Sequence, residues 1–249
     1  MKAALKRTAE RFGGHLFSRD SLPTGVNWLQ DIQRGLALDP APMCFDVGAN
    51  VGQTVADFRQ AMPDAHIHAF EPFSGPLASL RRAVASDDRV TVVPRAMGSM
   101  PGSIDVIPHK RSLMSSLVHI ADRDSDQVAE SIEIDTVDGY CTRNRIERID
   151  IFKSDTEGYD LEVLRGATGL LAYRRIAYVY VEVTFDPGNR QNSLFGPILE
   201  LLQHHGYRFL GLYETYPLHF YEEPLVFCNA MFVAPAVREL SLARRRASA

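Results

Sequence analysis

The residues best suited to chemistry begin in a glycine-bearing turn at residues 45–53, whose sequence is FDVGANVGQ. Gly48 and Gly52 allow strained backbone angles and the close approach of a ligand, and a helix that starts here offers free N–H groups. The turn lacks the G-x-G-x-x-G pattern of a dinucleotide site, and Asp46 precedes it. A carboxylate there would repel a pyrophosphate but could hold an ammonium group or a water molecule. The turn therefore favours a cationic amino-acid cofactor over a nicotinamide, with an ordinary strand-to-helix turn as the alternative.

A second acidic position, Glu71, ends another apolar run about twenty residues after Gly52. A carboxylate in this register typically accepts hydrogen bonds from both hydroxyls of a ribose. Pro72 and Phe73 follow, and Phe73 could pack on an adenine face or simply fill the core. The two segments together predict a nucleoside site at the ends of two strands.

A third polar segment, residues 153–160 (KSDTEGYD), follows a further apolar run. Asp155 and Glu157 could act as a base or bind a divalent metal, or Asp155 could merely cap the next helix. Glu182 lies among apolar neighbours, where a buried carboxylate needs a partner and often belongs to a functional site. These three acids are the candidate catalytic residues.

Alternating strands and helices must position these segments. Apolar runs predict strands at 43–47, 65–70, 90–93, 149–155, 177–185, 207–213 and 228–233. Helical periodicity predicts helices at 51–62, 77–84, 161–167 and 198–206 between them. This order predicts an α/β fold with a doubly wound parallel sheet and right-handed crossovers. Residues 103–107 and 131–135 alternate polar and apolar, which predicts a small β insertion after the third strand.

The whole-chain properties limit the other functions. The 249 residues carry a net charge of −4, which disfavours a nucleic-acid partner. No stretch is long and apolar enough to predict a membrane span. Three cysteines far apart in the sequence favour a reduced, cytoplasmic setting. We expect an N-terminal helical arm or lid at 1–40, a ligand-binding domain at 41–235 and a C-terminal tail at 236–249.

The order of these motifs resembles the FkbM family of S-adenosylmethionine-dependent methyltransferases. The resemblance covers residues 43–233 and rests on 46–52 (DVGANVG), 70–72 (FEP), 153–158 (KSDTEG) and 162–167 (EVLRGA). It implies the Rossmann-like class I methyltransferase sheet of seven strands with the last antiparallel. It also implies O-methylation of a sugar, glycan or natural product.

The resemblance also assigns residues to the cofactor site. The polar segment at Ser115 and Ser116 resembles a serine-bearing segment of the family. The segment with Asp155 and Glu157 matches the family's acidic motif, although Ser154 and Thr156 are more polar than usual and no role is carried onto Asp160. The predicted S-adenosylmethionine contacts are Asp46, Gly48, Ala49, Asn50, Gly52, Glu71, Pro72, Phe73, Ser115, Ser116 and Asp155.

Deprotonation of a hydroxyl acceptor requires a base whose pKa is raised by burial or by a like-charged neighbour, and Asp155 beside Glu157 fits that demand. A metal held by Asp155, Glu157 and Glu182 is an alternative that we do not predict, and His109, His119 and His219 are further base candidates. The loop at 186–192 and the aromatic stretch at 213–221 are expected to form the acceptor pocket. A nicotinamide oxidoreductase and a non-catalytic cofactor-binding module remain the rival functions, and a homodimer is left open.

Overall fold

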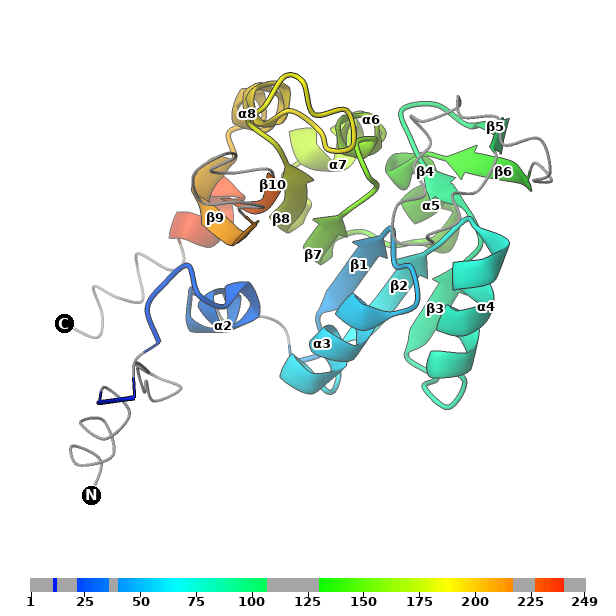
Figure 1. Ribbon diagram of the computed structural model, residues 1–249, viewed down its shortest axis with the longest axis horizontal. Helices are drawn as coiled ribbons and strands as arrows, with labels where there is room; N and C mark the ends of the chain where they lie inside the picture. Colours follow the sequence, from blue (N-terminus) through cyan, green and yellow to red (C-terminus); the bar gives the residue numbers. More distant parts are fainter. Residues whose placement is uncertain (1–10, 13–21, 36–39, 107–129, 217–226, 240–249) are drawn as a thin grey trace.

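The computed structural model describes residues 11–12, 22–35, 40–106, 130–216 and 227–239. At its centre is a seven-stranded sheet with the strand order β3-β2-β1-β7-β8-β10-β9 (Figure 1). Neighbouring strands from β3 to β8 are parallel, whereas β10 is antiparallel to both β8 and β9. The predicted doubly wound sheet of seven strands with an antiparallel last strand is therefore confirmed. The strands are β1 (Met43–Val47), β2 (His66–Phe70), β3 (Val90–Val93), β7 (Ile149–Ser154), β8 (Ile176–Val183), β9 (Arg208–Tyr216) and β10 (Phe227–Val233).

Helices cover both faces of the sheet because the central strands are apolar on both sides. Phe45 and Phe152 belong to a core that α5, α6, α7 and α8 complete, whereas Cys44 and Ile151 belong to a second core with α2, α3 and α4. The helices are α2 (Trp28–Gly35), α3 (Gln53–Ala61), α4 (Ser74–Ala83), α5 (Val137–Asn144), α6 (Asp160–Arg165), α7 (Thr168–Ala172) and α8 (Phe195–His204).

The N-terminal helix α2 is part of the second core. The ring of Trp28 stacks on Tyr180 of β8, with 4.1 Å between the ring centroids. Asp31 accepts hydrogen bonds from the Tyr213 hydroxyl at 3.0 Å and from the Gly25 amide at 2.7 Å. The described part of the expected arm at 1–40 thus packs on the sheet, and its expected boundary stays a prediction.

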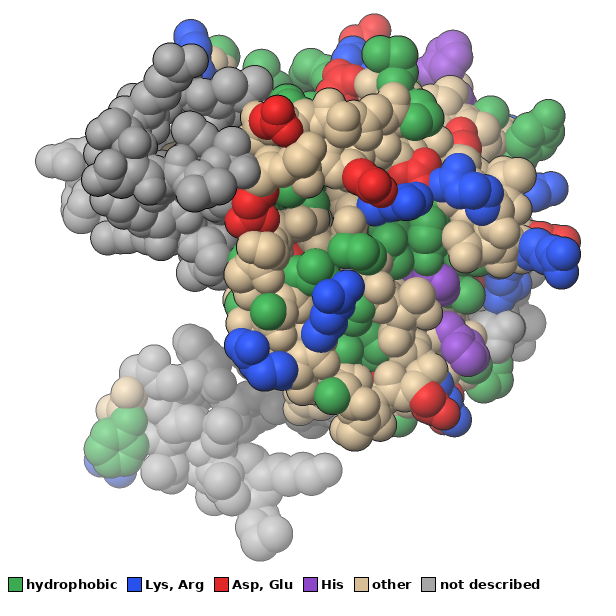
Figure 2. Space-filling view, turned by 90° about the vertical axis from the view of Figure 1, so that its right-hand side faces the viewer, with side chains coloured by type: hydrophobic (Ala, Val, Ile, Leu, Met, Phe, Trp, Pro, Cys, Tyr) green, Lys and Arg blue, Asp and Glu red, His purple; other side chains and the backbone are tan. Residues whose placement is uncertain are grey.

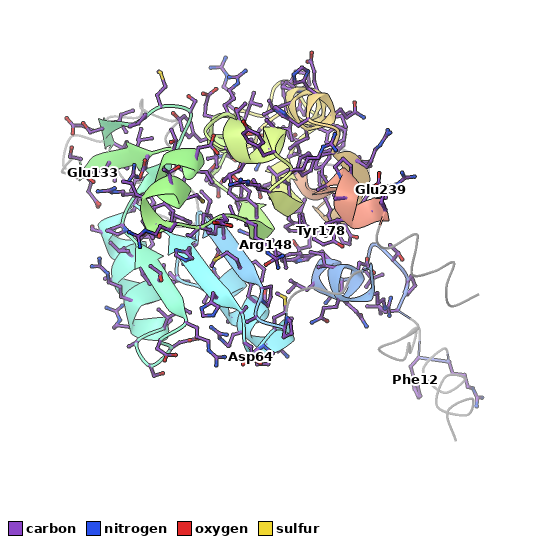
Figure 3. The ribbon with its side chains drawn as sticks, turned by 180° about the vertical axis from the view of Figure 1, so that it is seen from behind. Phe12, Asp64, Glu133, Arg148, Tyr178 and Glu239 are labelled. Carbon is purple, nitrogen blue, oxygen red and sulfur yellow. The ribbon has the colours of Figure 1, made fainter. Side chains whose placement is uncertain are left out.

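A separate three-stranded sheet lies between β3 and β7 in the sequence, in the order β4-β6-β5 (Figure 1). It consists of β4 (Ala96–Met97), β5 (Gly102–Val106) and β6 (Glu130–Asp135). Phe73, Ala96, Val106 and Ile132 form the small core beneath it. Glu133 of this sheet lies at one end of the molecule and Phe12 at the other (Figure 3). Because Phe73 belongs to the small core, the small sheet contributes apolar side chains beside the residues that follow Glu71.

Helix α5 is an element that the sequence analysis missed. Its apolar face is only two turns long, with Val137, Tyr140 and Cys141 buried. The Thr136 hydroxyl caps it by accepting a hydrogen bond from the Gly139 amide at 3.0 Å. Such a short pattern with an internal glycine gives a weak helical signal.

On the face that carries α4 and the small sheet, basic and acidic side chains are interspersed (Figure 2). Arg89 pairs with Asp64, and Arg95 pairs with Glu133. Within the described residues no helix has the length and apolarity needed to cross a bilayer. Cys44, Cys141 and Cys228 are buried free thiols.

Candidate active site

The turn after β1 is held by backbone contacts that only glycine permits. Gly48 has a φ of +83°, and a Cβ atom there would overlap the carbonyl oxygen of Asp155. The amides of Gly48 and Ala49 both donate to the Phe70 carbonyl at 3.0 Å. These contacts bring the ends of β1, β2 and β7 together at one edge of the sheet.

Glu71 connects that turn to the end of β2. Its two carboxyl oxygens accept hydrogen bonds from the amides of Asn50 and Phe73, each at 2.9 Å. Burial raises the pKa of Glu71 to about 7, although both amides oppose the rise. Each oxygen keeps a lone pair that can accept a further hydrogen bond. This carboxyl group can therefore accept hydrogen bonds from both hydroxyls of a ribose.

Lys153 of β7 places an ammonium group between two carboxylates. Its Nζ lies 3.3 Å from Asp46 Oδ1 and 3.2 Å from Asp155 Oδ2. Burial alone would lower the pKa of Lys153, but Asp155 and Asp46 outweigh that effect and raise it. For Asp46, burial raises the pKa and Lys153 opposes the rise. The ammonium group expected beside Asp46 is present, but it belongs to Lys153.

The loop after β7, residues 155–159, is fixed by the buried side chain of Asp160. Asp160 Oδ1 accepts hydrogen bonds from the Ser154 hydroxyl at 2.6 Å and from the Thr156 amide at 3.1 Å and hydroxyl at 2.9 Å. Tyr159 is the N-cap residue of α6, and its own side chain makes no capping hydrogen bond. The alternative that Asp155 caps the helix is therefore wrong, because the loop places the helix start five residues further along the chain.

Glu182 at the end of β8 faces the same region. Asn192 Nδ2 donates to Glu182 Oε2 at 2.5 Å. Burial, followed by the charges of Asp155, Asp160 and Glu157, raises the pKa of Glu182 well above its ordinary range. Burial and the charges of Asp155 and Asp160 raise the pKa of Glu157 to about 7. Glu157 and Glu182 therefore retain their protons to a higher pH than exposed carboxyl groups do.

These segments surround a cleft of about 300 Å³, which is at the lower end of the range for ligand pockets. The cleft lies over the carboxyl ends of β1, β2, β7 and β8, where a doubly wound sheet binds ligands. Its lining comprises Val47, Gly48, Ala49, Asn50, Gln53, Thr54, Phe70, Glu71, Pro72, Phe73, Arg95, Ala96, Met97, Lys153, Asp155, Thr156, Glu157 and Glu182.

Most of the residues predicted from the sequence line this cleft, including all three candidate catalytic acids, Asp155, Glu157 and Glu182. Asp46 and Gly52 are not in the lining, since Asp46 faces Lys153 and Gly52 forms the N-cap of α3. The predicted cofactor residues that do line the cleft are Gly48, Ala49, Asn50, Glu71, Pro72, Phe73 and Asp155.

Several predicted positions lie outside the described residues, namely Ser115, Ser116, His109, His119, His219 and residues 217–221. The loop at 186–192 is described but is not in the lining; its Asn192 donates a hydrogen bond to Glu182, which does line the cleft. Among the described residues, no three His, Cys, Asp or Glu side chains are arranged to hold a metal ion.

No individual role was predicted from the sequence for Lys153, Asp160 or Ser193, and Asn192 was placed only within the loop at 186–192 expected to form the acceptor pocket. Lys153 carried a usable signal, because a lysine within an apolar strand two residues before Asp155 needs a buried partner. Asn192 and Ser193 lie in a polar loop and gave no signal, because their partners are distant in sequence.

A family model described as the methyltransferase FkbM domain matches residues 46–209, which is more than half of the chain. The chain is 25% identical over 152 residues to 2-O-methyltransferase NoeI of Sinorhizobium fredii (strain NBRC 101917 / NGR234), a match that covers 56% of this chain and 63% of NoeI. Its fold resembles the crystal structure of methyltransferase FkbM from Methylobacillus flagellatus KT, with a TM-score of 0.53 and 15% identity over 80% of this chain and 44% of that chain. The chain thus spans less than two thirds of either relative. The family match favours the methyltransferase interpretation over the nicotinamide alternative.

Proposed function

The chain belongs to the methyltransferase FkbM family and has the class I methyltransferase fold, and from that premise we propose that it uses S-adenosylmethionine to methylate a hydroxyl group of a sugar, glycan or natural product. The observation that carries the proposal is that one cleft contains both the Glu71-linked turn and the acids of β7 and β8. A nucleoside site and a base are thereby adjacent.

The residues of the cleft fit this cofactor. Glu71 would hold the ribose, and Phe73 and Met97 offer apolar surface for the adenine. Asn50 Oδ1 is buried without a hydrogen-bond partner among the described residues, so it can accept a hydrogen bond from a ligand. The acidic lining suits a cation, and the bound sulfonium supplies an activated methyl group.

The acids at the ends of β7 and β8 would take the proton from the acceptor hydroxyl as its oxygen gains the methyl group. A base works best when its pKa is near the working pH, and Glu157 with a pKa of about 7 meets that condition. Lys153 holds Asp155 in the wall of the cleft through the 3.2 Å contact. We therefore assign proton removal to Glu157, with Asp155 and Glu182 as the neighbouring acids of the same cleft that take part in positioning the acceptor.

The test measures methyl transfer from S-adenosylmethionine to a panel of sugars and glycosides by mass spectrometry, with cofactor affinity measured by calorimetry. Asp155→Asn, Glu157→Gln and Glu182→Gln should each reduce turnover about 100-fold or more while changing cofactor affinity much less. Glu162→Gln is the matched control because it removes an acid from α6 outside the cleft.

If the protein binds the cofactor but methylates no acceptor, it is a binding module rather than an enzyme. Wild-type turnover in all three variants would remove the acids from the mechanism.

A further inference from the structure

Asn192 and Ser193 are consecutive polar residues in the loop between β8 and α8, and both are more than nine-tenths buried. Neither lines the cleft. Each nevertheless makes a hydrogen bond to a buried acidic side chain, and each acid belongs to a different strand or helix. Asn192 bonds Glu182 of β8, and Ser193 bonds Asp160 of α6.

The orientation of the Asn192 amide is set on both sides. Its Oδ1 accepts a hydrogen bond from Asn189 Nδ2 at 2.8 Å, which leaves its Nδ2 to donate to Glu182. Asn189 is held in turn, because its Oδ1 accepts the amides of Gln191 at 2.8 Å and Asn192 at 3.2 Å. The loop therefore presents a donor of fixed direction to Glu182.

Ser193 acts on the other acidic segment. Its hydroxyl accepts a hydrogen bond from the Asp160 amide at 3.1 Å and donates to Asp160 Oδ2 at 3.2 Å. The opposite oxygen of Asp160 holds Ser154 and Thr156, the two neighbours of Asp155. A displacement of Ser193 is therefore transmitted to the backbone that carries Asp155.

The loop after β7 and the loop after β8 are also in close backbone contact. Gly158 has a φ of +94°, and a Cβ atom there would lie only 3.2 Å from the Gln191 carbonyl oxygen and 3.3 Å from that of Arg190. The Thr184 amide donates to the Ser193 carbonyl at 2.9 Å, and the Phe195 amide donates to the Thr184 carbonyl at 2.9 Å. These two backbone hydrogen bonds hold the end of the loop, at residues 193–195, against the end of β8.

We infer that Asn192 and Ser193 are positioning residues that fix Glu182 relative to Asp155 and Glu157 for removal of the acceptor proton. This inference rests on the proposed function. The acids repel one another, and anchors of this kind oppose their separation. Reactive groups displaced by about 1 Å can lose about 100-fold in rate, so the anchors are expected to affect turnover.

Asn192→Asp is the sharpest test because it keeps the shape of the side chain and the bond from Asn189 but cannot donate to Glu182 when ionised. The lost donor and the added carboxylate raise the pKa of Glu182 and also that of its neighbour Glu157. We expect turnover to fall about 10-fold or more and the acidic limb of the kcat profile to move to higher pH, with cofactor affinity within about twofold of wild type. Gln191→Ala is the matched control, since only the backbone of Gln191 is used.

Ser193→Ala is the second variant, and Ser193→Thr should restore turnover by restoring the hydroxyl. Folded variants with wild-type kcat and an unmoved pH profile would overturn the inference, as would a parallel loss of cofactor affinity and turnover.

Glu182→Gln separates this inference from the proposed function. If that variant keeps wild-type turnover, the catalytic role of Glu182 fails. In that case a carbon-13 NMR titration of Glu182 in Asn192→Asp still tests the contact, and an unchanged titration would overturn it.

Discussion

The turn after β1 and the loop after β8 serve the same cleft, but different bonds hold them. In the turn, Gly48, Ala49 and Asn50 are fixed by their own amides, which donate to the Phe70 carbonyl and to Glu71. In the loop, Asn192 and Ser193 are fixed through side chains that reach acids of other elements. The side of the cleft proposed to bind the nucleoside is thus held mainly through backbone amides, whereas the side proposed to bind the acceptor is held by hydrogen bonds between side chains.

This difference predicts separate consequences for substitutions. A change that alters backbone angles in the turn should damage the fold, because several strands meet there. A change that removes a polar atom at the acceptor side should leave the sheet intact and alter turnover. Three substitutions, taken in order of decreasing predicted loss of stability, test that separation.

Gly48→Ala should have the largest effect, because the added Cβ would overlap the Asp155 carbonyl and the φ of +83° disfavours alanine. We expect a loss of about 3 kcal/mol or more in the free energy of unfolding, measured by urea denaturation. Gly75→Ala in α4 is the control, because a Cβ there meets nothing within 4 Å. Equal stability of the two variants would contradict the backbone account of the turn.

Asp160→Ala should have an intermediate effect on stability and a large effect on turnover. It leaves the buried Ser154 donor and the part-buried Thr156 donors unsatisfied, which costs about 1–3 kcal/mol. The loosened Asp155 segment should lower kcat more than it lowers cofactor affinity, as measured by steady-state kinetics and calorimetry. A loss of cofactor affinity as large as the loss of kcat would show that the two sides of the cleft are not separate.

Glu71→Gln should have the smallest effect on stability, about 1 kcal/mol, because the NH2 group of glutamine cannot accept from one of the two amides that Glu71 binds. It should weaken cofactor binding about 10-fold or more, since a hydrogen bond to a charged group contributes about 1.5–3 kcal/mol. The pKa of about 7 makes this contribution pH-dependent. Ribose hydroxyls favour the ionised carboxylate, so wild-type affinity should fall below pH 7 by up to about tenfold per pH unit and level off above it. Calorimetry at several pH values measures both effects, and a pH dependence that survives in Glu71→Gln would contradict the assignment.

The same raised pKa has a predicted effect on the stability of the protein without cofactor. The folded pKa of Glu71 lies above its value of about 4.3 in an unfolded chain, so the folded state holds the proton more tightly. The contribution of Glu71 protonation to the free energy of unfolding is therefore fully present below about pH 4.3 and is lost as the pH rises through 7.

The sheet could be predicted because its signals are local. Apolar runs with alternating helices gave all seven strands, and the proximity of the turn at 45–53 to Glu71 could also be predicted. Helix α5 was missed because its buried face consists of only three residues. The contact between Asp46 and Lys153 was not predicted, because Lys153 lies on a neighbouring strand whose register is set by the sheet.

Strand periodicity and residue type are properties of short stretches of chain, so the amino-acid sequence already indicates which segments carry glycine and carboxylate groups. How the acids are held depends instead on contacts that exist only in the folded protein. The bond between Asn192 and Glu182 and the bond between Ser193 and Asp160 form because β7 and β8 are adjacent and their loops fold back onto one another. The physical reason is that a hydrogen bond acts over about 3 Å, so a pair distant in the chain meets only after the sheet has fixed its register.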